Sequence, residues 1–251
     1  MKNKQPMKKV KVAVVDSGID YDERIDIIEQ RNFVEGEDEI SVLYNDLTGH
    51  GTAVASLIAA QSEGDTTLRG VNPNVDIYSA RIFSYTNQAK ISDVIKAVNW
   101  AIEKRVNIIC MSFGTNKYSL ALEKIMNYAY NNGVLLIAAA GNGGQNSNVE
   151  YPAAYDSVMA VGATNTKNQL SDFCSTGKEM EIVAIDNFFM GSSIKDCPSD
   201  FLDYYIPKYL KGYKLNKFMT FSKESYKEKG YTGKFESNYF YNNIKNVSYG
   251  D

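Results

Sequence analysis

The chain alternates short apolar runs with segments of helical apolar spacing, and this alternation constrains its fold more than any other feature. Residues 10–15 form a β-branched run typical of a buried strand, and residues 91–105 carry apolar side chains at every third or fourth position, as an amphipathic helix does. The same reasoning predicts strands at 75–83, 107–113, 134–140 and 157–163, and helices at 52–61 and 119–131. Continuous apolar strands alternating with helices predict an α/β fold of three layers, with a parallel sheet between helices.

The composition changes near residue 188. Residues 1–187 contain 19 alanines and residues 188–251 contain none, whereas nine of the 18 tyrosines lie after residue 188. The last 64 residues carry 10 Lys against 7 Asp plus Glu, or +3, so the first 187 carry 17 basic against 23 acidic residues, or -6. We therefore predict an α/β domain at 1–187 and an atypical Tyr-, Lys- and Asn-rich segment at 188–251.

Charge and composition exclude several classes of protein. A net charge of -3 lacks the basic excess of a nucleic-acid binder, and no apolar run approaches the ~18 residues of a membrane span. The basic N-terminus precedes an apolar stretch too short for a signal peptide, and three cysteines without C-x-x-C spacing indicate reduced thiols. We expect a cytoplasmic protein. The single histidine, His50, excludes any metal site that needs two histidines, and we predict no metal site.

Polar side chains gather where the predicted strands end. Asp16 follows the first strand, Ser112 the strand at 107–113 and Asn142 the strand at 134–140, and His50 precedes the first helix. In a parallel sheet these positions share one edge, and a carboxylate, an imidazole, a hydroxyl and a carboxamide suit acyl transfer. Taken singly, Asp16 could cap a turn, His50 could begin a helix and Asn142 could occupy a left-handed turn position.

Six short motifs resemble those of a known family, the subtilisin-like serine proteases (subtilases), and they occur along the chain in the same order as in that family. Residues 12–20 (Val-Ala-Val-Val-Asp-Ser-Gly-Ile-Asp) resemble the aspartate segment of that family and residues 50–55 (His-Gly-Thr-Ala-Val-Ala) its histidine segment. Residues 111–114 resemble its substrate-binding strand and residues 138–142 its oxyanion segment, and the remaining two motifs lie at 70–73 and 151–153. The resemblance spans about residues 8–186 and is greatest to the intracellular branch. It implies a subtilisin-like three-layer fold.

The resemblance also implies a role for each of these side chains. Asp16 would orient His50, which would act as general base and then as general acid, and Asn142 would donate its amide to the oxyanion. An extended peptide would bind as an added strand. Its backbone would pair with Ser112, Phe113 and Gly114.

The nucleophile segment departs from the family. The family's Gly-Thr-Ser, which begins a buried helix of small residues, is absent, and the nearby candidate is Gly191-Ser192-Ser193-Ile194, with Ser193 in the nucleophile position. Three explanations stay open. Ser193 could be a degenerate working nucleophile. The chain could be a pseudoprotease that binds peptide segments or regulates a partner protease. The reading frame could be a truncated or rearranged copy with a foreign tail.

The same features predict partners and cofactors. The resemblance implies a polypeptide substrate or peptide ligand and no required cofactor. Residues 35–39 hold four acidic side chains that could help bind calcium, although they lack the ligand spacing of an EF-hand. Because the missing central helix would leave an apolar face uncovered, we expect marginal stability, with self-association or a partner protein covering the incomplete core.

Overall fold

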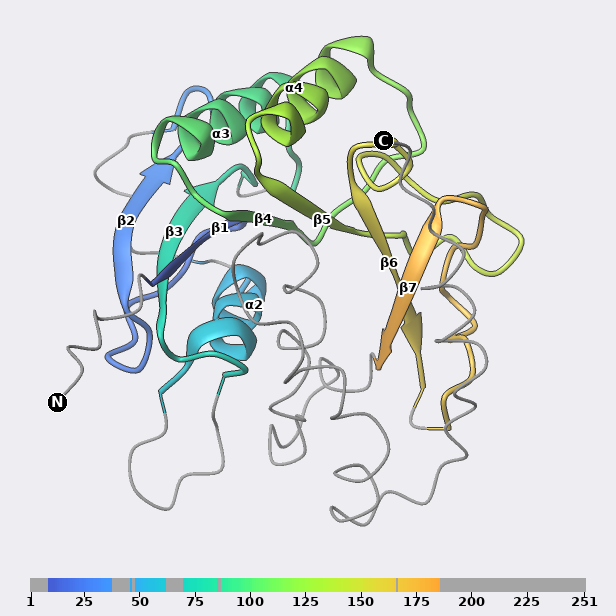
Figure 1. Ribbon diagram of the computed structural model, residues 1–251, viewed down its shortest axis with the longest axis horizontal. Coiled ribbons are helices and arrows are strands. Elements are labelled where there is room, and N and C mark those ends of the chain that lie inside the picture. The colour runs from blue at the N-terminus through green and yellow to red at the C-terminus, as the bar shows by residue number, and fades with distance from the viewer. Residues whose placement is uncertain are drawn as a thin grey trace, which may run out of the picture. The chain divides into compact units, whose positions relative to one another are not determined.

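Figure 1 shows a computed structural model of the chain, which describes residues 9–37, 46, 48–61, 70–84, 87–165 and 167–185. The chain divides into an N-terminal unit, Met1–Ile109, and a C-terminal unit, Cys110–Asp251. The boundary falls within strand β4 (Ile108–Met111). The segment predicted at 188–251, including Ser193, lies outside the described residues, so the predicted boundary near residue 188 stays a prediction.

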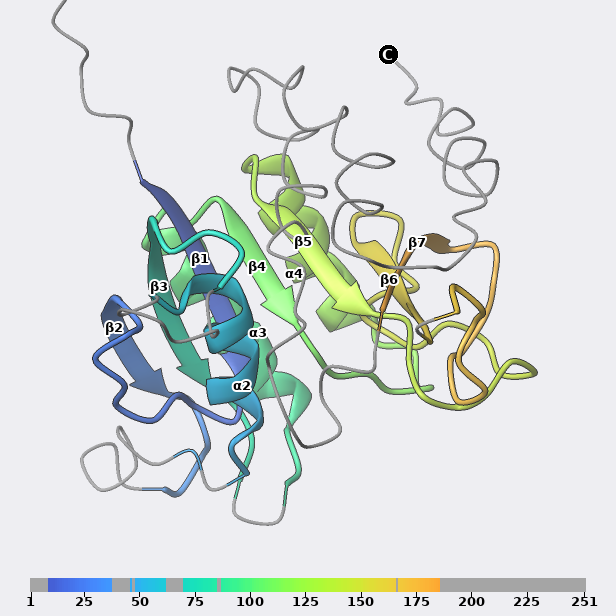
Figure 2. The same ribbon diagram turned by 90° about the horizontal axis from the view of Figure 1, so that it is seen from below.

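The N-terminal unit is a parallel sheet between two helices. Its strands lie in the order β2 (Ile27–Asn32), β3 (Val75–Arg81), β1 (Val10–Asp16), with β4 next to β1. Strand β3 pairs in parallel with both of its neighbours. Helix α2 (His50–Ala59) covers one face of the sheet and α3 (Ile91–Glu103) the other, as Figures 1 and 2 show. These are the three predicted layers.

Burial on both faces explains the apolar sequence of β1. Residues Val12 to Val15 are each at most 2% exposed, because α2 and α3 cover opposite faces of the strand. On α3, Trp100 is buried and packs edge-on against Phe33 and Tyr78, with ring centroids 5.7 and 6.0 Å apart. The predicted helical spacing at 91–105 therefore marks a face packed into the core.

The C-terminal unit is also built on a parallel sheet, with the strand order β4, β5 (Leu135–Ala139), β6 (Met159–Thr164), β7 (Met180–Ile185). Strand β6 pairs in parallel with β5 and with β7. Helix α4 (Leu120–Asn131) packs against β5 on one face of this sheet (Figure 2). The Ser119 hydroxyl accepts a hydrogen bond from Leu122 N–H at 3.3 Å, so Ser119 is the predicted N-cap.

Every strand and helix predicted from the sequence is present among the described residues. Each predicted end lies within two residues of the observed end. Strand β2 was missed because it is an edge strand whose side chains are all either partly buried or exposed, so it has no continuous apolar run. Among the described helices, none is both long and apolar enough to cross a membrane.

Candidate active site

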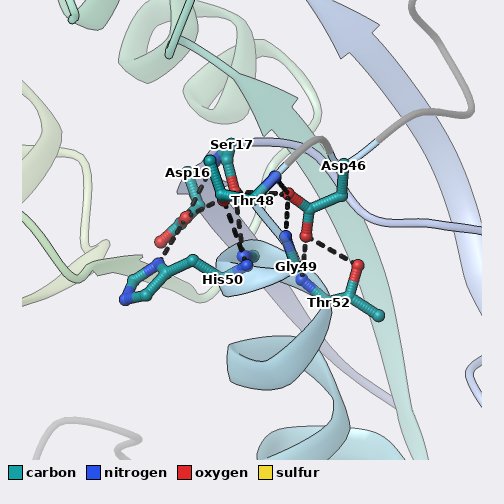
Figure 3. A network of polar contacts seen from close by, with 8 residues as sticks. Asp16, Ser17, Asp46, Thr48, Gly49, His50 and Thr52 are labelled. Atoms are coloured by element: carbon teal, nitrogen blue, oxygen red, sulfur yellow. Dashed lines mark hydrogen bonds and ion pairs between the residues drawn. The ribbon is translucent and has the colours of Figure 1, made fainter. Parts of the chain in front are cut away.

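Asp16 and His50 meet at the carboxyl end of β1. Asp16 is the last residue of β1 and is 2% exposed, and His50 is the first residue of α2, with a side chain that is 47% exposed. His50 Nδ1 lies 2.7 Å from Asp16 Oδ1 (Figure 3). Because an ionised carboxylate can only accept hydrogen bonds, Nδ1 must carry a proton in this contact. In the neutral ring the lone pair is then on Nε2. The pair predicted from the sequence is therefore formed.

Glycine at position 51 allows this approach. A Cβ on Gly51 would collide with the Gly18 carbonyl oxygen and would lie 3.2 Å from Asp16 Cβ. Gly18 itself has φ of 106°, a left-handed conformation that favours glycine. The turn after β1 and the first turn of α2 thus touch backbone to backbone. The Gly-x-Gly spacing around His50 brings the imidazole to the end of β1.

Three side chains bind the backbone N–H groups at the start of α2 (Figure 3), although the N-cap residue, Gly49, provides no side-chain cap. Asp46 accepts from Gly49 N–H at 3.0 Å and, through its other oxygen, from Thr52 N–H at 2.8 Å. The Thr48 hydroxyl accepts from His50 N–H at 3.1 Å, and the Ser17 hydroxyl accepts from Gly51 N–H at 2.9 Å. All of these donors, which a helix leaves unpaired at its N-terminus, are satisfied. The helix turn that carries His50 is therefore fixed by side chains outside the helix.

Ser17 connects the two buried carboxylates. Its hydroxyl lies 2.7 Å from Asp46 Oδ1 and 3.1 Å from Asp16 Oδ1, and a hydroxyl has one proton to donate. The shorter distance favours donation to Asp46. Asp16 Oδ1 then depends on Ser17 N–H, at 2.7 Å, and on His50. Asp16 Oδ2 is buried and has no hydrogen-bond partner among the residues that the structure describes.

Opposing effects set the pKa values of Asp46 and His50. Burial raises the pKa of Asp46, but hydrogen bonds from Thr52, Ser17 and Thr48 outweigh burial and hold this pKa below its ordinary value. The hydrogen bond to Asp16 raises the pKa of His50 above its ordinary value, against the opposing effect of burial. The negative charges of Asp16 and Asp46 add to this rise. The protonated imidazole is therefore stabilised by both carboxylates.

The predicted peptide-binding residues directly follow β4 in the C-terminal unit. Ser112 and Phe113 are half-buried and Gly114 is exposed. The next residue, Thr115, forms a two-residue antiparallel bridge with Tyr151, with N–H to O distances of 2.8 Å in both directions. This bridge fixes the segment at its end.

Asn142 lies in a glycine-rich turn after β5. Ser175 fixes this turn, because its N–H donates to the Gly141 carbonyl and its hydroxyl accepts from Gly143 N–H, each at 3.0 Å. Ser175 itself is fully buried. Asn142 is exposed, and its carboxamide has no partner among the described residues. The backbone of the turn is held while the amide stays available to a ligand.

The acidic segment at 35–39 is paired with cations in its described part. Glu35 lies 2.8 Å from Lys90 Nζ, and Glu37 lies 2.8 Å from the Arg81 guanidinium. The hydrogen bond from Lys90 lowers the pKa of Glu35. Over the described ranges, no three His, Cys, Asp or Glu side chains converge as a metal site would require. Because Asp38 and Glu39 lie outside those ranges, calcium binding stays a prediction.

Sequence reasoning missed two acidic residues that shape this arrangement. Asp46 was not singled out because its partners, Ser17 among them, come from distant segments. The only signal was its position four residues before His50, from which a carboxylate can reach the start of the helix. Glu150, whose side chain contacts Gly114 and Gly141, carried no motif signal. The structure does not describe Ser193, so its predicted role is untested.

An Asp–His pair at the carboxyl end of a parallel sheet defines a class of α/β protein suited to nucleophilic acyl transfer. The sequence profile of the subtilase family of peptidases matches residues 7–213. The chain belongs to the subtilase family, as its motifs indicate.

Similar proteins agree with this assignment. The chain is 40% identical over 177 residues to the minor extracellular protease Epr of Bacillus subtilis (strain 168), a match that covers 70% of this chain and 27% of that protein. It is 36% identical over 180 residues to subtilisin DY of Bacillus licheniformis, covering 70% of this chain and 64% of that protein.

A solved structure supports the fold. The crystal structure of the psychrophilic subtilisin-like protease Apa1 from the Antarctic psychrotroph Pseudoalteromonas sp. AS-11 aligns with a TM-score of 0.61 and 29% identity, covering 70% of this chain and 41% of that chain. The predicted subtilisin-like three-layer fold is confirmed. The matched part of the chain corresponds to 27% to 64% of the length of these three proteins.

Proposed function

We propose that this chain is the catalytic domain of a subtilisin-like serine endopeptidase, with Asp16, His50 and Ser193 as the triad and Asn142 as the oxyanion donor. The observation that carries the proposal is the 2.7 Å contact between His50 Nδ1 and the buried Asp16 carboxylate. The family match extends through residue 213 and so includes Ser193. This chain matches only part of the length of its relatives. The activity of a whole protein is therefore also a proposal.

The reaction would use these groups in two half-reactions. His50 Nε2 takes the proton of the Ser193 hydroxyl as Oγ bonds to the scissile carbonyl carbon, and the Asn142 amide donates to the resulting oxyanion. His50 then gives this proton to the leaving amine as the C–N bond breaks. In the second half-reaction, water loses a proton to His50 and attacks the acyl-enzyme, and the proton returns to Ser193 Oγ.

Asp16 would stabilise the imidazolium that forms in each half-reaction. Its hydrogen bond raises the pKa of His50, which means that it favours the charged ring over the neutral one. The bond also keeps Nδ1 protonated, which directs the lone pair of Nε2 to the serine. The network around Asp46 holds the helix turn that carries the ring. Polypeptide is the substrate class, bound along Ser112, Phe113 and Gly114.

A fluorophosphonate probe tests the nucleophile directly. An activated serine forms an Oγ–P bond and expels fluoride, so the wild-type protein is expected to be labelled. Ser193→Ala is expected to abolish labelling, whereas Ser192→Ala, the matched control one residue away, is expected to retain it. Labelling that persists in Ser193→Ala would assign the nucleophile to another residue. A folded wild-type protein that never reacts would refute the catalytic proposal.

A second candidate function follows from the absence of Gly-Thr-Ser. The sequence Gly191-Ser192-Ser193-Ile194 stands where the family has that motif, and a pseudoprotease would keep peptide binding without turnover. Such a protein would bind extended peptide segments or regulate a partner protease. The two candidates separate on one measurement, the cleavage of an unstructured polypeptide followed by mass spectrometry. Cleavage that disappears in His50→Ala excludes the pseudoprotease.

A further inference from the structure

The side chain of Glu150 lies against two glycines from different segments of the C-terminal unit. A Cβ on Gly141 would lie 2.6 Å from Glu150 Cδ and 2.8 Å from Oε1. A Cβ on Gly114 would lie 2.8 Å from Glu150 Cβ and would collide with Oε2. Because any larger residue at either position would displace this side chain, the two glycines make the space that the carboxylate occupies.

The backbone around Glu150 fixes this placement. Glu150 N–H donates to the Ala140 carbonyl at 2.8 Å, next to Gly141. The following residue, Tyr151, forms the two-way bridge to Thr115, next to Gly114. The residue is thus tied to the segment after β5 and to the segment after β4. These backbone hydrogen bonds hold the Glu150 carboxylate between the two segments.

No positively charged side chain compensates the Glu150 carboxylate within the part of the chain that the structure describes. Among the residues that the structure describes, it forms no ion pair and its side chain accepts no hydrogen bond, although Glu150 is half-buried. Glu37, which is also half-buried, is by contrast paired with Arg81 at 2.8 Å. A partly desolvated carboxylate without a partner is unfavourable, so a cation that reached it would gain both attraction and hydrogen bonds.

The neighbouring residues leave this carboxylate open to a ligand. Gly114 is exposed and has no side chain to cover the site, and Gly141 directly precedes the exposed Asn142. In the proposed function, a peptide lies along Ser112–Gly114 and Asn142 binds the carbonyl oxygen at the scissile bond. The substrate residue that provides that carbonyl would therefore direct its side chain toward the space between the two glycines.

We infer that Glu150 is a specificity-determining residue that selects a basic side chain, arginine or lysine, at the substrate residue on the acyl side of the scissile bond. The inference rests on the proposed peptide-binding function and names its substrate class. An apolar side chain there would bury the carboxylate further without a counter-charge. Arginine, with its planar fork of donors, can bond both carboxylate oxygens, and lysine supplies a point charge.

The test compares two labelled peptide amides that are identical except for a C-terminal arginine or citrulline. Citrulline has nearly the same shape as arginine but no charge, so the ratio of the two dissociation constants isolates the carboxylate. By fluorescence anisotropy the wild-type protein is expected to favour arginine by at least about tenfold, since a hydrogen bond between two charged groups is stronger than one between a charged and a neutral group. Glu150→Gln is expected to reduce the ratio below about twofold, and Glu150→Asp, which keeps the charge, to retain a preference.

Two further measurements separate the possible failures. Glu103→Gln removes the same charge from an exposed site at the end of α3 and is expected to leave the ratio unchanged. Equal affinity for both peptides in the wild type, or a preference that survives Glu150→Gln, overturns the inference alone. If neither peptide binds, the proposed function fails and the inference with it. If the peptides bind with the expected preference but mass spectrometry finds no cleavage of a longer arginine-containing peptide, the inference stands and the endopeptidase proposal fails.

Discussion

The Asp16–His50 region and the Asn142 turn are stabilised in opposite ways. Around Asp16 and His50, the buried groups bond mainly to one another, and Asp46, Thr48 and Ser17 satisfy the first N–H groups of α2. Around Asn142, protein bonds fix only the backbone, and the exposed carboxamide and the nearby Glu150 carboxylate are left without partners among the described residues. A proton-transfer group needs one fixed geometry, whereas groups that meet a substrate must keep hydrogen-bonding capacity for it.

The largest expected effect comes from Asp16→Asn. The neutral amide keeps the shape of the carboxylate but cannot stabilise the imidazolium, so kcat is expected to fall on the order of 10⁴-fold. Peptide cleavage measures the loss, and circular dichroism checks that the protein is folded. Asp26→Asn is the matched control, because Asp26 forms an exposed ion pair with Lys9 at 2.7 Å and such pairs contribute little. Full activity in Asp16→Asn would show that the pair does not act in the reaction.

The pH profile of the wild type sharpens this prediction. Because Asp16 raises the pKa of His50, the neutral ring that can accept a proton is formed only above the ordinary value of 6.5. Activity is expected to rise with pH through a midpoint above 6.5. The stabilising contribution of the Asp16–His50 contact has the opposite sign: it is complete below 6.5 and is lost as pH rises through the folded pKa. A midpoint below 6.5 in the pH dependence of kcat/KM would contradict the assignment.

Asn142→Ala is expected to have the next largest effect. Removing one oxyanion donor costs about 100- to 1,000-fold in kcat with little change in KM, since the amide bonds to a charge that forms only in the transition state. The free protein should keep its stability, because the carboxamide has no partner among the described residues. Asn146→Ala, at an exposed position of the same turn, is the control and should leave kcat within about twofold. A loss of thermal stability as large as the loss of activity would assign Asn142 a structural role instead.

The sequence predicted the parts of the molecule that follow from short-range pattern. Strand β1 was found because both of its faces are buried, and β2 was missed because an edge strand lacks a continuous apolar run. The Asp16–His50 contact was predicted because the ends of parallel strands share an edge, and because the motifs around the two residues resemble those of the subtilases. Asp46 and Glu150 were not found, because their environments are made by residues distant in sequence, such as Ser17 for Asp46 and Gly114 for Glu150.

Asp46→Asn is expected to have the smallest effect on activity and to act mainly through stability. In the variant, the NH₂ group of the asparagine side chain replaces one of the two carboxylate oxygens. This NH₂ group then faces the N–H of either Gly49 or Thr52, so at least one charge-assisted hydrogen bond becomes a repulsive contact. We expect a loss of about 1–3 kcal/mol in the free energy of unfolding, measured by urea denaturation at pH 7. Ser56→Ala, which removes the bond from Ser56 Oγ to the Thr52 carbonyl within the same helix, is the control and should cost less.

The pH dependence of that loss identifies its source. The folded pKa of Asp46 lies below its ordinary value of 3.8, so the carboxylate contributes stability at pH values above 3.8 and loses it as pH falls through the folded pKa. The difference in stability between wild type and Asp46→Asn should therefore be constant from pH 5 to pH 6, where His50 stays protonated, and shrink below pH 3.8. Since Asp46 also raises the pKa of His50, the activity midpoint of the variant should move to lower pH. A stability difference that does not change with pH would mean that packing, and not the charge of Asp46, holds the turn that carries His50.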